Sequence, residues 1–402
     1  MRSDSPAVRR ADAAVFVVFA ASGMAFATWA SRLVAIRSSL GVDPGRMGLL
    51  LLFWSAGSMA AMPLAGRMVG RFGGRRVIFV FASLMLAGLI GAGVAAGAGS
   101  QAAVAALLLA AGAGLGVWDV AMNIAGSDTE RALGRTAMPR YHAGYSLGTV
   151  AGGLAGAGAA RLGLPLPAHF GLVAGVCFAA TAWCVRQLLR GGASAATAGR
   201  GTDLLPDAVP SPPAPRSRSA WLEPRTLLVG AMMLALSLAE GAAGDWAASG
   251  IVQGFGAPEA VGIVGLTVFL TAQTATRLLG TSLVDRWGRP AAIRASAVAA
   301  VAGVAVYALA PALPLAVAGC ALWGMGAALV FPLGISAAGD DPARAAQRTS
   351  VVSTIGYGAF LTGPPLLGML ADHVGFRLAM LALVPPIVIA ALIAPAARPP
   401  QP

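Results

Sequence analysis

Ionisable side chains lie inside several long apolar runs of this sequence: Asp119, Glu240, Asp245 and Arg277. A charge at the centre of a lipid bilayer costs roughly 3 kcal/mol, so such a residue usually faces a water-filled cavity or an opposite charge. A carboxyl group can exchange a proton or accept hydrogen bonds from a solute, whereas a guanidinium only donates. These residues are the first candidates for a solute or proton site.

Asp119 lies four residues before Asn123, so the two side chains share a helix face, and Trp118 directly precedes them. In one interpretation Asp119 exchanges a proton or binds solute hydroxyl groups, with Trp118 as an aromatic wall. In the other interpretation Asp119 pairs with an arginine such as Arg131 or Arg140.

Glu240 and Asp245 are five residues apart, which points their side chains about 140° away from each other on a helix. We therefore predict that at most one of them faces a cavity well. Glu240 is the preferred proton-carrying candidate, and Asp245 is expected at the outer mouth. The small residues 241–244 between them permit close helix packing.

Arg277 forms a stripe with Gln273 and Thr281 at helical spacing. The stripe could bind an anionic or hydroxylated solute. For Arg277 an interhelical salt bridge near a gate is the favoured interpretation, because a guanidinium in an apolar run needs a partner. Glu130 and His142 flank a basic loop and are candidates for a cytoplasmic gate.

Polar side chains also open the apolar run at 139–160 and form a stripe within the run at 348–370. They could line a cavity or bond to neighbouring helices. These residues are Tyr141, His142, Tyr145 and Ser146 in the first run, and Ser350, Ser353, Thr354 and Tyr357 in the second.

The composition indicates that lipid is the main solvent. Of 402 residues, 57% are hydrophobic and 11% charged, whereas a soluble domain carries about 25% charged residues. The sequence has no Ser/His/Asp triad, no His/Cys metal cluster and no nucleotide-binding loop, so neither an enzyme, a metal site nor a cofactor is expected. The net charge of +12 comes from arginines spread between apolar segments, which argues against nucleic-acid binding.

Twelve apolar segments are long enough to cross a bilayer, which takes about 20 residues. The sequence therefore predicts an all-α integral membrane protein with twelve transmembrane helices. The segments are 11–33, 45–68, 76–97, 101–123, 139–160, 166–189, 225–247, 259–283, 290–310, 313–336, 348–370 and 375–395.

The 28 basic residues are all arginine, and 22 of them lie at the termini, in every second connection or at the segment ends next to those connections. Cytoplasmic connections carry the excess of basic residues in membrane proteins, so both termini are expected in the cytoplasm.

A Gly/Ala/Ser-rich and then Pro-rich stretch, 191–224, is predicted to be a flexible cytoplasmic linker. It separates a six-helix bundle at 1–190 from a second at 225–402. A repeated loop supports this division: GRMVGRFGGRR (66–76) follows the second segment, and TSLVDRWGRP (281–290) follows the eighth, at an offset of 215 residues.

These loops resemble the Gly-x-x-x-Asp-Arg-x-Gly-x-Arg/Lys loop of the major facilitator superfamily. Gly70 replaces the aspartate of the first copy, and Thr281 replaces the first glycine of the second. A charged latch at the cytoplasmic gate, which the resemblance implies, would therefore depend on Asp285. The matching gate residues are Gly66, Arg71, Gly73, Arg75 and Arg76 in the first copy, and Asp285, Arg286, Gly288 and Arg289 in the second.

Four more segments resemble the YbjJ-like group of that superfamily, near the fucose-permease-like sugar transporters. The resemblance implies two six-helix bundles that rock about a central site, usually driven by a proton gradient, in a protein that is by default a monomer of the inner (plasma) membrane. The segments are DVAMNIAGSDTE (119–130), MPRYHAGYSLG (138–148), GDWAASGIV (244–252) and GYGAFLTGPPLLG (356–368).

We therefore expect a secondary active transporter that moves a small solute, sugar-like or amphipathic, across the lipid bilayer by alternating access with proton coupling. Import and export are both compatible with these residues. The alternative is a receptor or regulator with a transporter fold, which would bind a ligand without net transport.

Overall fold

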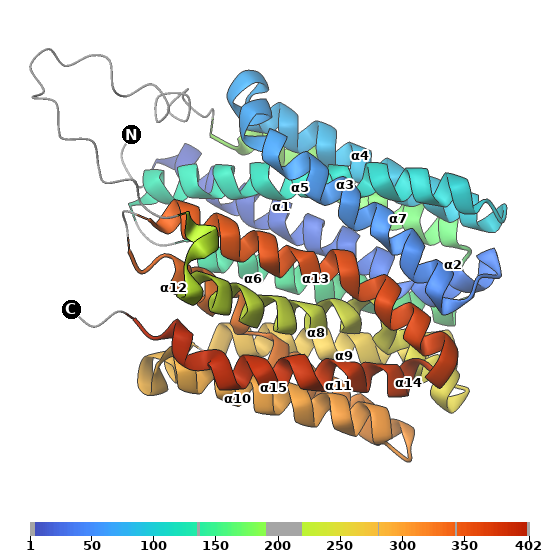
Figure 1. Ribbon diagram of the computed structural model, residues 1–402. Coiled ribbons are helices and arrows are strands. Elements are labelled where there is room, and N and C mark those ends of the chain that lie inside the picture. Colours follow the sequence, from blue (N-terminus) through green and yellow to red (C-terminus); the bar gives the residue numbers. More distant parts are fainter. Residues whose placement is uncertain (1–4, 135–136, 190–218, 280, 342–343, 400–402) are drawn as a thin grey trace, which may run out of the picture.

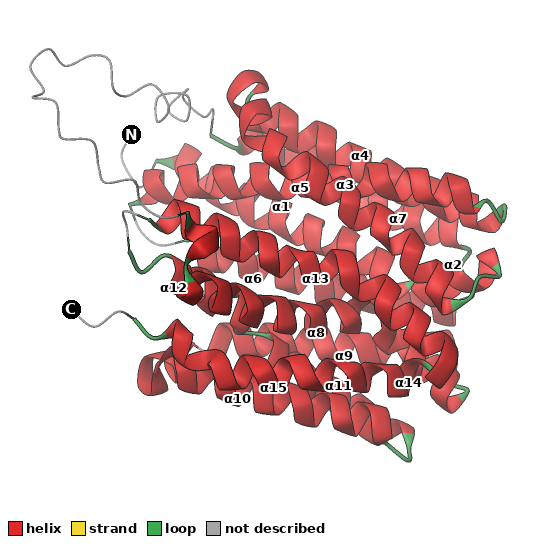
Figure 2. Ribbon diagram, in the orientation of Figure 1, coloured by secondary structure: helices red, strands yellow, loops and turns green. Residues whose placement is uncertain are grey.

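The computed structural model describes residues 5–134, 137–189, 219–279, 281–341 and 344–399, and in these ranges the regular structure is entirely helical (Figure 2). Long helices run side by side through the whole molecule (Figure 1). The first helix begins and the last one ends at the same end of the molecule, which we call the terminal side; the other end is the distal side.

The first half of the chain, residues 5–189, contains one short and six long helices. Ser5 and Asp43 each accept a hydrogen bond from the first turn of the helix that follows, directly before a proline, which favours a helix start. The helices are α1 (Pro6–Ser31), α2 (Leu33–Leu40), α3 (Pro44–Phe72), α4 (Gly74–Gly97), α5 (Gln101–Leu133), α6 (Met138–Arg161) and α7 (Leu166–Gln187).

The second half, residues 219–399, begins near the end of the predicted linker, most of which lies outside the described residues. Its elements are η2 (Ala220–Leu222), α8 (Pro224–Phe255), α9 (Glu259–Leu279), α10 (Thr281–Leu309), α11 (Leu313–Ala327), α12 (Val330–Ala338), α13 (Ala345–Val374), α14 (Phe376–Ala379), η3 (Met380–Leu383), α15 (Val384–Ile393) and η4 (Ala394–Ala397).

Ten helical segments in the described residues are long and apolar enough to cross a membrane. The two long helices outside this set are α6 and α13, with 24 and 30 residues. Both are rich in glycine and in polar side chains, which lowers their hydropathy.

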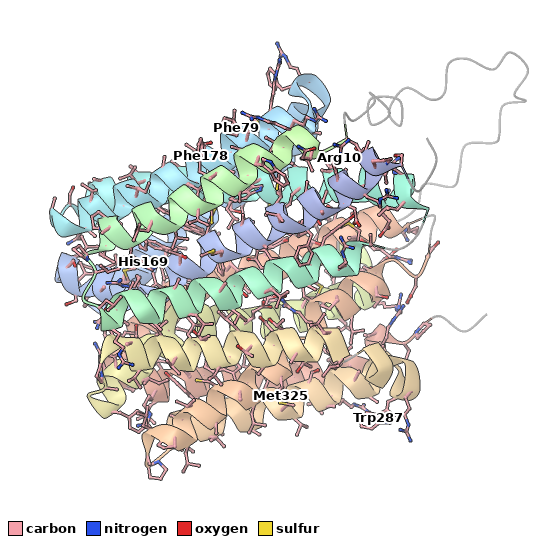
Figure 3. The ribbon with its side chains drawn as sticks, turned by 180° about the vertical axis from the view of Figure 1, so that it is seen from behind. Arg10, Phe79, His169, Phe178, Trp287 and Met325 are labelled. Atoms are coloured by element: carbon pink, nitrogen blue, oxygen red, sulfur yellow. The ribbon has the colours of Figure 1, made fainter. Side chains whose placement is uncertain are left out.

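Large apolar side chains cover much of the outer surface. Seen from behind (Figure 3), Phe178 and Met325 lie on the outside of the bundle, and their exposed fractions are 44% and 45%. Further exposed leucines and valines occur on most of the long helices. Water would not favour so many exposed apolar groups, whereas lipid tails do.

The two repeated loops have the same backbone turn. Gly73, between α3 and α4, has φ 82° and ψ 141°, and Gly288, within α10, has φ 76° and ψ 163°. Residues with a side chain rarely adopt this region. The glycines are the positions that the sequence repeat aligns, so the repeat extends to backbone geometry.

Glycines hold the helices of the first half in close contact. A Cβ atom on Gly112 of α5 would overlap the carbonyl oxygen of Trp54 on α3, and one on Gly148 of α6 would overlap that of Ala20 on α1. Membrane helices associate through such small-residue contacts, because no hydrophobic effect acts between them in lipid.

The two halves meet mainly along α3 with α13 and α6 with α9. Near the distal side, Arg32 Nε lies 3.0 Å from Glu259 Oε1, and the Gly45 amide donates to Asp372 Oδ2 at 3.0 Å. Each of these contacts joins one half to the other, so they close the distal side.

The ion pairs on the terminal side include several within single halves. Asp12 pairs with Arg140 in the first half at 3.0 Å. Asp340 pairs with Arg225 at 2.7 Å and with Arg289 at 2.6 Å in the second half. Each of these pairs joins elements of one half only.

We predict that Gly112→Ala destabilises the protein, because the new methyl group must push α3 and α5 apart. Overpacking of this kind costs roughly 1–3 kcal/mol. The thermal midpoint of the detergent-purified protein, followed by size-exclusion chromatography of heated samples, should fall by several degrees.

The matched control is Gly171→Ala in α7, where a Cβ atom meets no atom of the described residues within 4 Å. It should leave the midpoint unchanged or raise it slightly, since alanine favours helix. Equal midpoints for the two variants would contradict the packing argument.

We also predict that Glu259→Gln opens the distal side. The glutamine oxygen can still accept a hydrogen bond from Arg32, but the charge that balances this buried guanidinium is lost, which costs about 1.5–3 kcal/mol. The ratio of closed to open molecules should therefore fall about tenfold or more. Spin labels at Ser39→Cys and Ala312→Cys, one in each half, would report this as a new, longer distance.

The native Cys177, Cys184 and Cys320 are buried and should not take up label. Arg161→Gln removes an exposed charge near the distal end of α6 and is the control. An identical distance distribution in Glu259→Gln and wild type would rule out a role for this ion pair in closure.

Candidate functional site

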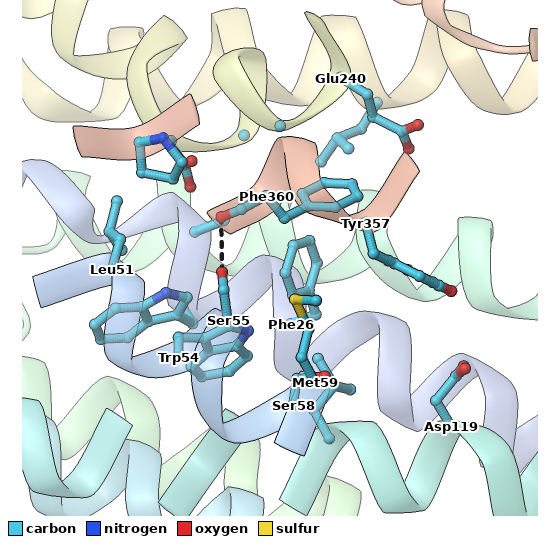
Figure 4. A pocket seen from close by; sticks show the side chains of 18 of the residues that line it. Phe26, Leu51, Trp54, Ser55, Ser58, Met59, Asp119, Glu240, Tyr357 and Phe360 are labelled. Atoms are coloured by element: carbon cyan, nitrogen blue, oxygen red, sulfur yellow. Dashed lines mark hydrogen bonds between the residues drawn. The ribbon is translucent and has the colours of Figure 1, made fainter. Parts of the chain in front are cut away.

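A cavity of about 290 Å³ lies between the two halves (Figure 4). Helices α1, α3, α5 and α6 contribute from the first half, and α8, α9 and α13 from the second. Most of its wall is apolar or aromatic. The large apolar residues include Phe26, Trp29, Leu51, Trp54, Met59, Met62, Leu115, Phe269, Leu270 and Phe360.

Two tryptophans form one aromatic wall. The rings of Trp29 on α1 and Trp54 on α3 are stacked, with centroids 5.6 Å apart and planes 6° apart. On the same helix as Trp54, the Ser55 hydroxyl donates to the Phe360 carbonyl oxygen across the seam between the halves at 2.9 Å. The hydrogen bond fixes α13 beside α3 at the level of the cavity.

Trp118 does not form the aromatic wall that we predicted for it. Its side chain is 0% exposed and packs inside the first half, because successive residues on a helix point about 100° apart. Asp119, the next residue, lines the cavity. The chemistry expected of Trp118 is available instead from Trp29 and Trp54.

Asp119 reaches the cavity without a cationic partner in the described part of the chain. Its neighbour Asn123 does not line the cavity, and the Asn123 amide donates to the Asp119 carbonyl oxygen at 2.8 Å and to Oδ1 at 3.4 Å. The arginines considered as partners pair elsewhere, Arg131 with Asp128 and Arg140 with Asp12.

Glu240 and Asp245 both line the cavity, which corrects the prediction that at most one of them would. The residues Gly241 and Gly244 line it as well. Because these glycines have no side chains, the cavity extends around α8 and reaches both carboxyl groups. Asp245 is half-buried in this wall rather than at an outer mouth.

Arg277 forms the interhelical salt bridge that the sequence favoured. Its Nη2 atom lies 2.9 Å from Glu240 Oε1, and its Nε donates to the Ala328 carbonyl oxygen at 3.1 Å. Arg277 thus connects α9 to α8 and reaches the cavity through Glu240. Gln273, one turn away, lines the cavity directly, and its Nε2 has no hydrogen-bond partner among the described residues.

Tyr145 and Tyr357 complete a polar cluster at one end of the cavity. Tyr145 lies near Asp119, Glu240 and Arg277. Figure 4 shows Asp119 and Glu240 on opposite walls with Tyr357 between them. Acidic groups from both halves therefore share one site, with two phenol groups that can donate hydrogen bonds to either.

The polar faces continue from the cavity toward the terminal side. His142 lies one turn before Tyr145 on α6, is exposed and is close to Arg277 of the other half. Thr354 lies about one turn before Tyr357 on α13 and is also exposed. With the distal side closed, these residues indicate an opening to the terminal side.

The gate candidates Glu130 and His142 make their contacts within the first half. Glu130 Oε2 accepts hydrogen bonds from the amides of Ala137 and Met138 at 2.6 and 2.7 Å, which holds the start of α6. His142 packs edge-on against Phe19, with ring centroids 5.2 Å apart. Neither contact reaches the second half, although His142 faces it.

The loop residues differ in their contacts. Arg75 donates to the Leu188 carbonyl oxygen, and Arg71 lies over the ring of Phe72. Arg289 pairs with Asp340. The side chains of Thr281 and Asp285 lie outside what the structure describes, so the predicted latch on Asp285 stays a prediction. The other matched residues, exposed on the surface, are Gly66, Gly73, Arg76, Arg286 and Gly288.

Sequence reasoning missed the Arg32–Glu259 pair and the partners of Asp340. A signal existed for the first: Arg32 ends the first apolar run, and Glu259 begins the eighth, on the same predicted side of the membrane. Asp340 gave no signal, since acidic residues in a polar connection are common. Its two arginine partners come from distant parts of the chain.

A family model described as the Major Facilitator Superfamily matches residues 14–357 and 226–402. The protein named Uncharacterized transporter y4wD, from Sinorhizobium fredii (strain NBRC 101917 / NGR234), is 33% identical over 364 residues, which are 90% of this chain and 91% of the relative.

Two solved structures show the same fold. The nucleoside transporter NupG superposes with a TM-score of 0.72 at 14% identity, covering 98% of this chain and 99% of NupG. A bacterial homolog of the human lysosomal transporter Spinster, in an inward-facing and occupied conformation, gives 0.74 at 14% identity, covering 98% and 97%. This chain belongs to the Major Facilitator Superfamily and is a multi-pass membrane transporter, not an enzyme.

Proposed function

We propose that this protein is a secondary active transporter that moves a small solute by alternating access, coupled to protons. The observation that carries the proposal is the cavity that both halves line, closed on the distal side by contacts between the halves and polar toward the terminal side. A seam that closes at one end and opens at the other is what two rocking bundles require.

The proposal includes twelve membrane spans in two bundles, 1–190 and 225–402, with both termini in the cytoplasm. Helices α6 and α13 count as spans because each lines the cavity beside the apolar helices, through Tyr145 and Tyr357. A helix of 24 residues is about 36 Å long, enough for a hydrocarbon core of roughly 30 Å. The arginine distribution supports the orientation.

In the proposed coupling step, Asp119 and the Glu240–Arg277 pair compete for one positive charge. With Asp119 ionised, the Arg277 guanidinium is attracted across the cavity toward the first half. Protonation of Asp119 removes that attraction and leaves Arg277 with Glu240, the arrangement seen here at 2.9 Å. A proton would thus change how strongly the two halves hold together.

The solute would be a sugar-like or amphipathic molecule. The stacked tryptophans and phenylalanines offer flat apolar surfaces for a ring, and Tyr145, Tyr357 and Ser58 offer hydroxyl groups. Similar proteins include a nucleoside transporter, and the segment 119–130 supports a place in the YbjJ-like group. A monomer in a bacterial inner membrane is part of the same proposal. The receptor alternative gains no support from these contacts.

We predict that proteoliposomes containing the protein and a pH-sensitive dye show a solute-dependent pH change. The panel would contain neutral sugars, nucleosides, sugar acids and amphipathic amines. Asp119→Asn and Glu240→Gln should each reduce the proton signal to the level of empty liposomes, because each removes one of the two acids of the switch.

Glu240→Gln also leaves Arg277 without a partner, which by itself destabilises the protein. The double variant Glu240→Gln/Arg277→Gln removes both charges and is the control for folding. It should recover the yield of folded protein but not the proton signal. A full proton signal in Asp119→Asn and in the double variant would eliminate the proposed coupling.

A further inference from the structure

We propose that the cavity binds a small organic cation, held by the Asp245 carboxylate between aromatic walls. The inference rests on the proposed function for the role of the cavity, and it names the class of substrate. It is carried by the charge of the cavity wall, the partners of its three acids, its aromatic surfaces and one buried amide.

The cavity wall is acidic. Asp119, Glu240 and Asp245 line it, and its described lining contains no arginine, lysine or histidine. Arg277 lies behind Glu240 and offsets that one charge. With all three acids ionised, the wall repels anionic solutes such as sugar acids and phosphates, and it attracts cations.

Asp245 differs from the other two acids in having no partner among the described residues. Asn123 donates to Asp119, and Arg277 pairs with Glu240. For Asp245 the described residues supply neither a hydrogen bond nor an ion pair. A carboxylate in an apolar wall is costly unless it is paired. The ammonium group of a ligand would be that pair.

The walls fit the body of such a ligand. Trp29 and Trp54 present stacked indoles, and Phe26 and Phe360 line the same cavity. The face of an aromatic ring attracts a cation by about 0.5–2 kcal/mol, and aromatic surfaces of this kind bind quaternary ammonium groups. A volume of about 290 Å³ is near the lower end of ligand cavities, so the ligand is small.

A buried amide adds a further requirement. Gln273 is 5% exposed, lines the cavity, and its Nε2 has no hydrogen-bond partner in the part of the chain that the structure describes. A buried donor without an acceptor is unfavourable. The ligand would therefore carry a hydroxyl or carbonyl oxygen besides its ammonium group.

Benzoylcholine combines a quaternary ammonium, a carbonyl oxygen and a flat ring, and 3,3-dimethylbutyl benzoate is its neutral isostere. Hippurate is an anion with the same ring. In calorimetry on the purified full-length protein, benzoylcholine should bind at least tenfold more tightly than the neutral ester, and hippurate should not bind.

Asp245→Asn should remove the preference for benzoylcholine over the neutral ester. Gln273→Leu should weaken both esters by a few-fold, since both have the carbonyl group. Asp128→Asn, an acid on the terminal part of α5 that pairs with Arg131, is the matched control and should change neither affinity. An equal affinity for the two esters in wild type would overturn the proposal.

A second measurement does not depend on the shape of the ligand. Ser58→Cys places a thiol on the cavity wall, while the native cysteines are buried. The reaction rate of this thiol with a cationic and with an anionic methanethiosulfonate reagent is measured, and each rate is divided by the rate of the same reagent with a free thiol. The normalised rate should be at least tenfold higher for the cationic reagent, and Asp245→Asn should lower this cation-to-anion ratio several-fold. A ratio near one would overturn the proposal even where benzoylcholine fails to bind.

The two proposals fail in different ways. Proton-coupled flux of a neutral sugar that Asp245→Asn leaves unchanged would overturn the cation inference and leave the transport proposal standing. Binding of benzoylcholine that needs Asp245, together with no flux of it in proteoliposomes at any pH gradient, would retain the cation inference and overturn coupled transport of this class.

Discussion

Lipid cannot solvate a charge, and most of this structure follows from that constraint. Each ionisable group inside the helices must pair with another group or face the cavity. Arg277 pairs with Glu240, and Asp12 pairs with Arg140 and accepts a hydrogen bond from Tyr141 at 2.7 Å. The same constraint brings Asp119 and Asp245 to the seam between the halves, where water or a ligand can reach them. The location of the site is thus a consequence of the solvent.

A second consequence concerns rigidity. Within the first half, glycines such as Gly112 and Gly148 bring backbones into contact, so the helices cannot slide without overlap. Between the halves the distal contacts combine the Arg32–Glu259 ion pair with close helix packing, since a Cβ atom on Gly48 of α3 would overlap the Pro364 carbonyl oxygen of α13. Opening the distal side would therefore have to break an ion pair and separate closely packed helices.

The sequence predicted the membrane class, the all-helical architecture and the repeated loop, because apolar length and turn glycines act locally. It also predicted that Arg277 would form an interhelical salt bridge, but it could not identify Glu240 as the partner, since helical spacing defines directions about one axis only. Helical spacing points Glu240 and Asp245 in different directions, and from this we predicted that only one of them faces the cavity. Both line it, because Gly241 and Gly244 let the cavity extend around α8. The prediction that Trp118 forms an aromatic wall was wrong for a related reason: its neighbour Asp119, not Trp118, points to the seam.

Proton binding and solute binding in the cavity are subject to one electrostatic condition, the neutralisation of its charges. If the halves close around it on both sides, the wall is cut off from water, and uncompensated charge becomes expensive. Arg277 already neutralises Glu240, which leaves Asp119 and Asp245. A proton on Asp119 and a cationic solute at Asp245 would neutralise them, and neither alone would suffice. Proton and solute would then be coupled through the shared cost of a charged, closed cavity, without any contact between them. The two acids lie on different halves, on α5 and α8. This fits the arrangement, because closure of the halves removes water from both carboxyl groups at once.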